Sequence, residues 1–179
     1  ILIYDFGGGT FDLTLITKSG TQLNVIAKDG VNKLGGKEFD EIVQETIRAD
    51  YEKAFGVPFP SDKLTNNRVQ KIAENIKIEL NDAATPANIS KWIMIGRDAF
   101  ESTFYYDGYA ARATQLITKT EQAVNRCLRS LGMQFTDVNK LVLIGGTSSS
   151  KLVYNFWKQK IAPHQELIYH QPLSSVAKG

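Results

Sequence analysis

The first sixteen residues constrain the fold of this chain more than any other stretch. They read ILIYDFGGGTFDLTLI, which places three consecutive glycines, Gly7 to Gly9, between two apolar runs. In the second run Phe11, Leu13 and Leu15 alternate with polar residues. Alternation with a period of two on both sides of a glycine turn predicts a β-hairpin.

The predicted turn has the chemistry of an anion-binding loop. Glycine has no Cβ atom, so the N–H groups of such a turn can approach a bound anion and point at it. Asp5 precedes the glycines, and Thr10 and Asp12 follow them. Carboxylates beside a phosphate-sized cradle suit a hard cation such as Mg²⁺, held through its waters. The alternative is a tight hairpin whose Asp residues only cap the turn, and the glycines alone do not decide between the two.

Two glycine pairs each come just before a predicted helix. Gly35 and Gly36 end a loop, and Gly145 and Gly146 follow the apolar run 141–144, which we expect to be a strand buried on both faces. A glycine pair that leads into a helix N-terminus can accept a phosphate or a sugar closely. For the first pair a flexible hinge is an equally good interpretation, and the second pair is weak evidence by itself.

A helix predicted at residues 65–80 carries a possible binding face beside its apolar stripe. Glu74, Lys77, Ile78 and Asn81 lie at positions i, i+3, i+4 and i+7, which share one face of a helix. The alternative for Glu74 and Lys77 is an exposed ion pair within the helix, worth only about 0.2–0.5 kcal/mol.

The rest of the pattern predicts mixed α and β structure. A third strand is expected at residues 23–28, then a loop at 29–36 and a helix. The elements expected beyond residue 81 are a turn at 82–86, strands at 87–90, 92–95 and 166–169, a helical turn at 97–101, a long helix at 110–131 and a helix that opens at 172–179.

Composition excludes some classes of protein. A length of 179 residues suffices for one sizeable domain or two small lobes. The net charge of +2 gives no indication of nucleic acid or an anionic membrane as partner, and no apolar run approaches the roughly 20 residues of a membrane span. The one cysteine, Cys127, excludes an internal disulfide and fits a reducing compartment, so we expect a cytoplasmic protein.

Four strings, in the same order and with near-family spacing, resemble motifs of the DnaK family, the heat shock protein 70 chaperones of the actin-like ATPase superfamily. They are DFGGGTFD at 5–12, LGGKEFD at 34–40, AENIKIELN at 73–81 and VLIGGTSSSKL at 142–152. The string RDAFE at 97–101 and the string at 172–179 are also similar to family motifs, the second only in part.

This resemblance implies an α/β fold. The chain would be the second lobe of a nucleotide-binding domain, an actin-like ATPase lobe whose base resembles ribonuclease H. Residues 1–34 and 113–179 would form this base (IIA-like), and residues 35–112 a smaller α/β cap (IIB-like). Because the chain starts within an expected strand without Met and stops where a helix should begin, we expect a piece of a longer protein that lacks its first lobe.

The resemblance also implies roles for individual residues around ATP or ADP and Mg²⁺. In the family, the hairpin glycines Gly7, Gly8 and Gly9 hold the phosphates, Asp5 and Asp12 hold waters of Mg²⁺, and Thr10 positions the attacking water. Asp5, Thr10 and Asp12 would therefore be the catalytic residues. The nucleoside would be bound by Glu74 and Lys77 at the ribose, by Ile78 and Asn81 at the adenine, and by Gly35, Gly36, Gly145, Gly146 and Ser149.

Two departures from the family pattern predict weaker nucleotide binding. Ser149 stands where the family has an Arg that stacks on adenine, and Leu173 stands where it has an Asp. Loss of a guanidinium removes a planar stacking partner.

The implied function is half of the ATP-binding domain of a chaperone in the stress response. In the full-length protein, ATP hydrolysis would drive binding and release of unfolded clients by a peptide-binding domain, with a nucleotide-exchange factor and a J-domain co-chaperone as partners. This fragment alone should not hydrolyse ATP. The alternatives are an actin-like filament protein, a sugar or acetate kinase, and a degenerate relative without ATPase activity, which Ser149 and Leu173 keep open.

Overall fold

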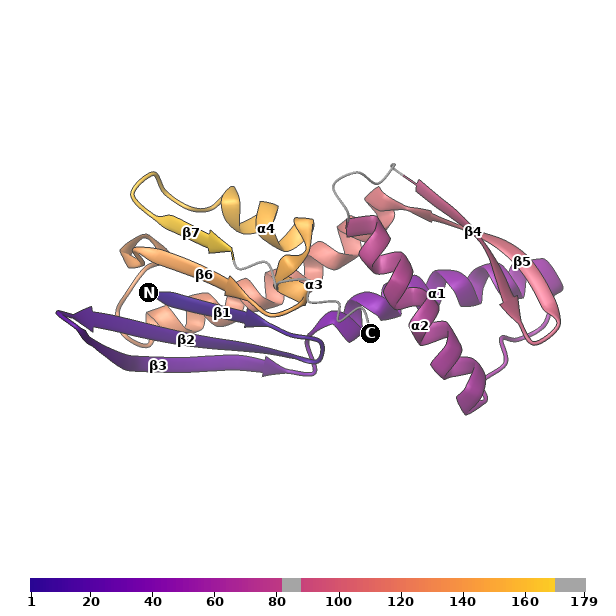
Figure 1. Cartoon of the computed structure of the whole chain (residues 1–179), viewed down its shortest axis with the longest axis horizontal. Coiled ribbons are helices and arrows are strands. Elements are labelled where there is room, and N and C mark those ends of the chain that lie inside the picture. The colour runs from indigo at the N-terminus through magenta and orange to yellow at the C-terminus, as the bar shows by residue number, and fades with distance from the viewer. Residues whose placement is uncertain (82–87, 170–179) are drawn as a thin grey trace, which may run out of the picture. The chain divides into compact units, whose positions relative to one another are not determined.

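The computed structural model describes residues 1–81 and 88–169 (Figure 1). The chain divides into two compact units, Ile1–Gly36 with Gln115–Gly179, and Lys37–Thr114. The sequence analysis set its boundaries at residues 34/35 and 112/113, and the identification of the units as base and cap stays a prediction. The mixed α/β class is confirmed by both units.

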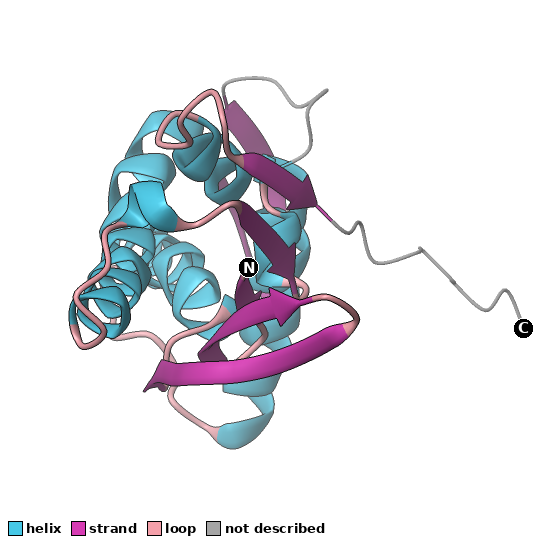
Figure 2. Ribbon diagram, turned by 90° about the vertical axis from the view of Figure 1, so that its left-hand side faces the viewer, coloured by secondary structure: helices cyan, strands magenta, loops and turns pink. Residues whose placement is uncertain are grey.

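The first unit is built on a five-stranded sheet in the order β3-β2-β1-β6-β7 (Figure 1). Figure 2 colours the strands magenta and the helices cyan. Its strands are β1 (Leu2–Phe6), β2 (Thr10–Ser19), β3 (Gln22–Asn32), β6 (Lys140–Ile144) and β7 (Glu166–Tyr169). The first three strands form an antiparallel meander, and β6 and β7 continue the sheet in parallel to β1. The predicted hairpin and the predicted strand at 166–169 are thus confirmed.

One face of this sheet forms the core of the first unit. Along β1 and β2 the buried cross-strand pairs are Leu2–Leu15, Tyr4–Leu13 and Phe6–Phe11. The helices α3 (Tyr106–Arg129) and α4 (Lys151–Lys158) supply the buried side chains that pack against them. The Tyr4 hydroxyl lies 2.6 Å from Thr120 Oγ1 of α3, and the Tyr4 ring lies 5.4 Å from the ring of Trp157 on α4.

The opposite face of the sheet is only partly covered, which corrects the prediction for β6. Leu141 and Leu143 are buried, but Val142 and Ile144 are half-buried, so this strand is not enclosed on both faces. The same face carries Asp5, at the end of β1. Two short 3₁₀ turns complete the unit, η1 (Phe135–Asp137) and η2 (Thr147–Ser149).

The second unit contains two long helices and a two-stranded antiparallel sheet. Its elements are α1 (Gly36–Phe55), α2 (Lys63–Asn81), β4 (Asn88–Ile95), β5 (Asp98–Tyr105) and residues 106–114 of α3. The first residue of α1, Gly36, still belongs to the first unit. The inner side of the sheet buries apolar residues, among them Ile93 and Phe100.

Several predicted boundaries in this unit were wrong. The expected strands 87–90 and 92–95 form a single strand, β4, within the described residues. Residues 97–101, expected as a helical turn, form the tight turn after β4 and the first half of β5. The reason is that Phe100, Ser102 and Phe104 are buried while their neighbours are largely exposed, which is the period-two pattern of a strand.

Helix and strand ends also differ from expectation at other places. β3 continues through Asn32 instead of ending at residue 28. Helix α2 begins at Lys63, two residues before the predicted first residue, Thr65. The Thr65 N–H donates to the Asp62 carboxylate at 3.0 Å. Helix α3 spans 106–129 rather than 110–131, so Leu131, which the predicted helix included, lies beyond its end and is 42% exposed.

Three sequence-based predictions lie outside the described residues: the turn at 82–86, the helix at 172–179 and the role of Leu173. Among the residues that the structure describes, no helix is long and apolar enough to cross a membrane. Cys127 is buried on α3, where a free cysteine packs as a small apolar residue.

Candidate functional site

The candidate site is centred on the turn between β1 and β2. The Gly7 N–H donates to the Thr10 carbonyl at 3.0 Å, which closes a two-residue loop formed by Gly8 and Gly9. A Cβ atom built on Gly8 or on Gly9 would meet no other atom within 4 Å. One side of the turn is therefore open, and a ligand can come directly against its main chain.

Two other segments come together at this turn. The Gly7 carbonyl accepts a hydrogen bond from the Gly36 N–H at 3.0 Å and another from Thr147 Oγ1 at 2.7 Å. A Cβ on Gly35 would lie only 2.6 Å from the carbonyl carbon of Gly8, so the two glycine segments pack main chain against main chain. Glycine is the residue that fits there, because any side chain would push the turn away.

The second glycine pair packs beside β1. Gly145 has a φ of +91°, and a Cβ there would lie 2.5 Å from the Phe6 carbonyl oxygen and 2.7 Å from Asp5 Oδ1. Its neighbour Gly146 is exposed, with open space where a Cβ would be. Parallel pairing of β6 with β1, which sets Ile144 opposite Asp5, brings this pair to the hairpin.

Ser149 lies just after this glycine pair, in η2. Its side chain is exposed, and its hydroxyl donates to the Gly146 carbonyl at 2.6 Å. Its own carbonyl accepts from the Tyr169 hydroxyl at 3.0 Å. In this arrangement Ser149 bonds to its own turn and presents no planar group on which a base could stack.

Two carboxylates flank the turn on the partly exposed face. Asp5 and Asp12 are directly opposite each other in the β1–β2 register. Partial burial raises the pKa of Asp5, and the negative charge of Asp12 raises it further. Like charges in directly opposed positions of a sheet repel, so a cation near both would be bound favourably.

These donors fit Mg²⁺ bound through water better than a dehydrated metal centre. Within the described part of the chain, no group of three or more His, Cys, Asp or Glu side chains could hold a metal ion. Mg²⁺ keeps several of its waters and binds through one or two carboxylates together with phosphate oxygens. Asp5 and Asp12 supply the carboxylates, and the open glycine amides could hold the phosphates whose oxygens complete that combination. Thr10, between them in the sequence, is exposed.

The predicted nucleoside face belongs to α2 in the second unit. Lys77 Nζ lies 2.7 Å from Asp40 Oδ1 on α1, an ion pair that the sequence analysis did not anticipate. The Asn81 amide donates to the Lys77 carbonyl at 2.8 Å and to the Tyr109 hydroxyl at 3.0 Å. Glu74 is exposed, and Ile78 is 60% exposed.

The structure therefore gathers the predicted residues in two sets. The first unit carries Asp5, Gly7, Gly8, Gly9, Thr10, Asp12, Gly35, Gly36, Gly145, Gly146 and Ser149, and the second carries Glu74, Lys77, Ile78 and Asn81. Sequence analysis gave no role to Thr147 or Asp40, although both stand inside the motifs that it singled out. The sequence signal that could have identified them is their place in these strings, Asp40 in the string at 34–40 and Thr147 in the string at 142–152.

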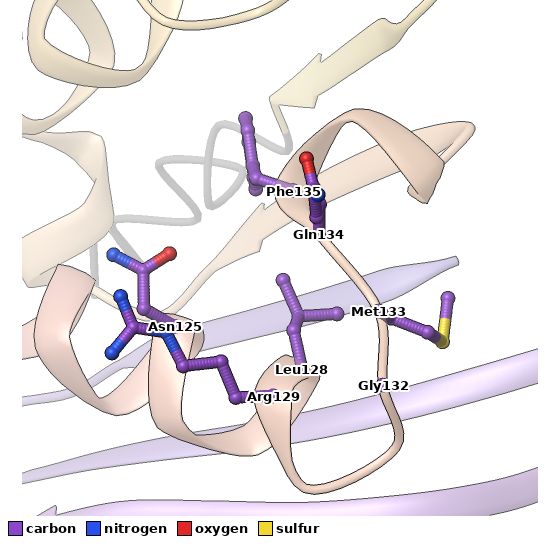
Figure 3. A pocket seen from close by; sticks show the side chains of 7 residues that line it. All are labelled: Asn125, Leu128, Arg129, Gly132, Met133, Gln134 and Phe135. Carbon is purple, nitrogen blue, oxygen red and sulfur yellow. The ribbon is translucent and has the colours of Figure 1, made fainter.

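Two surface hollows formed by described residues lie away from the hairpin. The larger, of about 480 Å³, lies where α3 ends and is lined by Asn125, Leu128, Arg129, Gly132, Met133, Gln134 and Phe135 (Figure 3). The smaller, of about 220 Å³, lies in the second unit and includes Leu80 and Tyr109.

Comparison with known families gives a match that spans most of the chain. The family model described as Hsp70 protein matches residues 1–161. The match runs from β1 past the end of α4 and includes every residue of the two sets above.

Proposed function

Because this chain belongs to the Hsp70 protein family, we propose that its first unit binds the phosphates of ATP or ADP together with Mg²⁺. The chain is a relative of chaperone ATPase domains. The observation that carries the proposal is the close main-chain packing at the hairpin. Gly35 lies against the Gly8–Gly9 peptide and Gly145 against the end of β1, while a Cβ on Gly8 or Gly9 would still meet no atom within 4 Å.

Each residue of the turn has a separate task in this proposal. The Gly8 and Gly9 N–H groups donate to phosphate oxygens, which glycine allows because no Cβ intervenes. Asp5 and Asp12 would accept hydrogen bonds from the waters of Mg²⁺, and Thr10 would orient the water that attacks the terminal phosphate. When bound, Mg²⁺ would neutralise the phosphate charge. Phosphoryl transfer depends on such positioning and neutralisation, so no covalent role is needed.

The nucleoside contacts are proposed for the second unit and for the segment after β6. Glu74 and Lys77 would bind the ribose hydroxyls, and Ile78 and Asn81 would border the adenine. Gly35, Gly36, Gly145 and Gly146 would allow close approach of the ligand to the main chain. Since Ser149 offers no stacking surface, we expect weaker nucleotide binding than a member with Arg at this position would show.

In the full-length protein, a first lobe would complete the ATP site and a peptide-binding domain would hold unfolded clients. Nucleotide-driven rotation of the lobes would then control client binding and release in the cytoplasm, assisted by J-domain and nucleotide-exchange partners. These roles are carried over from the family.

The test is calorimetric titration of Mg·ADP into the full-length protein that contains this chain. Gly8→Ala fills the open side of the turn without a clash, so the fold should persist while the dissociation constant rises about tenfold. Gly108→Ala is the matched control, because a Cβ on Gly108 also meets no atom within 4 Å, and it should bind as the wild type does. Equal affinity of wild type and Gly8→Ala would overturn the proposal.

A degenerate relative that binds nucleotide without hydrolysing it is the second candidate. The bond of the Ser149 hydroxyl to the Gly146 carbonyl favours it, because the position bears no cationic group. Binding of Mg·ADP by full-length protein that shows no turnover of ATP would select this candidate.

A further inference from the structure

We infer that Asp40 is a positioning residue, which holds the Lys77 ammonium where it can bind the hydroxyls of a nucleoside. The inference rests on the proposed function, since it assumes that α2 provides the nucleoside contacts. Its observation is the ion pair itself: Lys77 Nζ on α2 lies 2.7 Å from Asp40 Oδ1 on α1.

Burial makes this pair a fixed feature. The Asp40 side chain is 6% exposed and that of Lys77 is 18% exposed. A buried carboxylate is stable only when an opposite charge compensates it, so an excursion of Lys77 would leave Asp40 uncompensated. Lys77 is therefore confined to one place, unlike an ordinary surface lysine with its freely rotating stem.

The charges around Asp40 increase its dependence on Lys77. Burial raises the pKa of Asp40, and the hydrogen bond and charge of Lys77 oppose this. Glu74 on α2 and Glu38 on α1 raise the pKa further, and Tyr109 of α3 faces the same carboxylate. The positive charge of Lys77 thus opposes the rise in the Asp40 pKa that burial and the two acidic neighbours cause.

The pair can position Lys77 without consuming its binding capacity. An ammonium has three N–H donors, so the bond to Asp40 by itself does not prevent Lys77 from donating to a ligand hydroxyl. The next turn of α2 is fixed in a similar way, because the Asn81 amide donates to the Lys77 carbonyl and to the buried Tyr109 hydroxyl. If Asp40 instead sequestered Lys77 from ligands, its removal would increase affinity, which is the opposite result.

The experiment uses two probes on the full-length protein, Mg·ADP and Mg·pyrophosphate, with affinity measured by calorimetry. Asp40→Asn keeps the size of the side chain and removes its charge. We expect the affinity for Mg·ADP to fall about tenfold and that for Mg·pyrophosphate to stay unchanged. Asp50→Asn is the matched control: Asp50 lies on the same helix, accepts a hydrogen bond from Ser102, and should affect neither probe.

A double-mutant cycle separates positioning from general loss of stability. Lys77→Met should lower the affinity for Mg·ADP, and adding Asp40→Asn to it should lower it no further. The double variant also avoids an unpaired buried charge, so it remains measurable if Asp40→Asn alone fails to fold. Additive losses, an unchanged or increased affinity of Asp40→Asn, or an equal loss for both probes would each overturn the inference.

The failure of the inference differs from the failure of the proposed function. Wild-type protein that binds neither probe refutes both. Wild-type protein that binds both probes, with Asp40→Asn behaving like Asp50→Asn, refutes the positioning role alone and leaves the phosphate site standing.

Discussion

Replacement of Asp12 by Asn should stabilise the ligand-free chain, because Asp12 and Asp5 are like charges in directly opposed positions. The pairs of this hairpin alternate in type. Ile1 and Ile16 exchange two main-chain hydrogen bonds of 2.8 Å, so every second pair, including Asp5–Asp12, is of the hydrogen-bonded type. The Cβ atoms of such a pair are about 5.5 Å apart.

The magnitude follows from this geometry. Two carboxylates about 6 Å apart repel by about 1 kcal/mol at an effective dielectric constant of about 60. Asp12 is exposed, so solvent screening reduces the repulsion to about 0.5–1 kcal/mol. For a chain of 179 residues this gain corresponds to a rise in Tm of about 1–4 °C.

The assay is thermal and urea unfolding at neutral pH and low salt, repeated in about 1 M salt, where the Debye length of about 3 Å should reduce the gain. Asp29→Asn is the matched control of opposite sign, because Asp29 accepts two hydrogen bonds from Arg126, at 2.7 and 2.8 Å. It should lower the free energy of unfolding. The reasoning is refuted if Asp12→Asn leaves that free energy unchanged or lowers it.

Three further predictions concern the same region. Gly145→Ala should destabilise the chain by more than about 2 kcal/mol in urea unfolding, because a Cβ at a φ of +91° would lie 2.5 Å from a main-chain oxygen of β1; an unchanged midpoint would contradict the packing described. The pKa of Asp5 is raised above 3.8, so its contribution to stability is present below that pH and is lost as the pH rises through the folded-state value. The free energy of unfolding of Asp5→Asn should therefore exceed that of wild type by an amount that grows as the pH rises from 3.8. A difference that stays constant with pH would contradict the raised pKa. The 179-residue chain should show no hydrolysis of labelled ATP in a single-turnover assay; turnover near the rate of the full-length protein would disprove this.

The hairpin and the family could be predicted because their signals are local. Gly7 to Gly9 between alternating runs specify a turn between two strands whatever the rest of the chain does. The family assignment is confirmed by the match over residues 1–161. The roles of the individual site residues stay predictions, because they depend on a ligand that binds to several segments at once.

The errors came from residues whose local preference is overridden by their neighbours in the fold. Ser102 is buried in β5 and donates to Asp50, so a polar residue interrupts the apolar alternation that would have identified the strand. Gly30 suggested a loop, yet it lies inside β3, where a Cβ would lie 2.7 Å from the Phe11 carbonyl oxygen. The Asp40–Lys77 pair joins two helices, and no periodicity within either helix can reveal it.

The Gly7 carbonyl joins parts of the chain that are synthesised far apart in time. Its partner Thr147 follows 140 residues later, and each paired residue of β6 follows its β1 partner by 139 residues. At about 5–20 residues per second a ribosome needs roughly 7 to 28 s to cover that distance. Until β6 has been made, the β1 edge of the nascent meander lacks its β6 partner. An unpaired strand edge can pair with another chain, so this relative of chaperone ATPase domains is itself open to misassociation during synthesis.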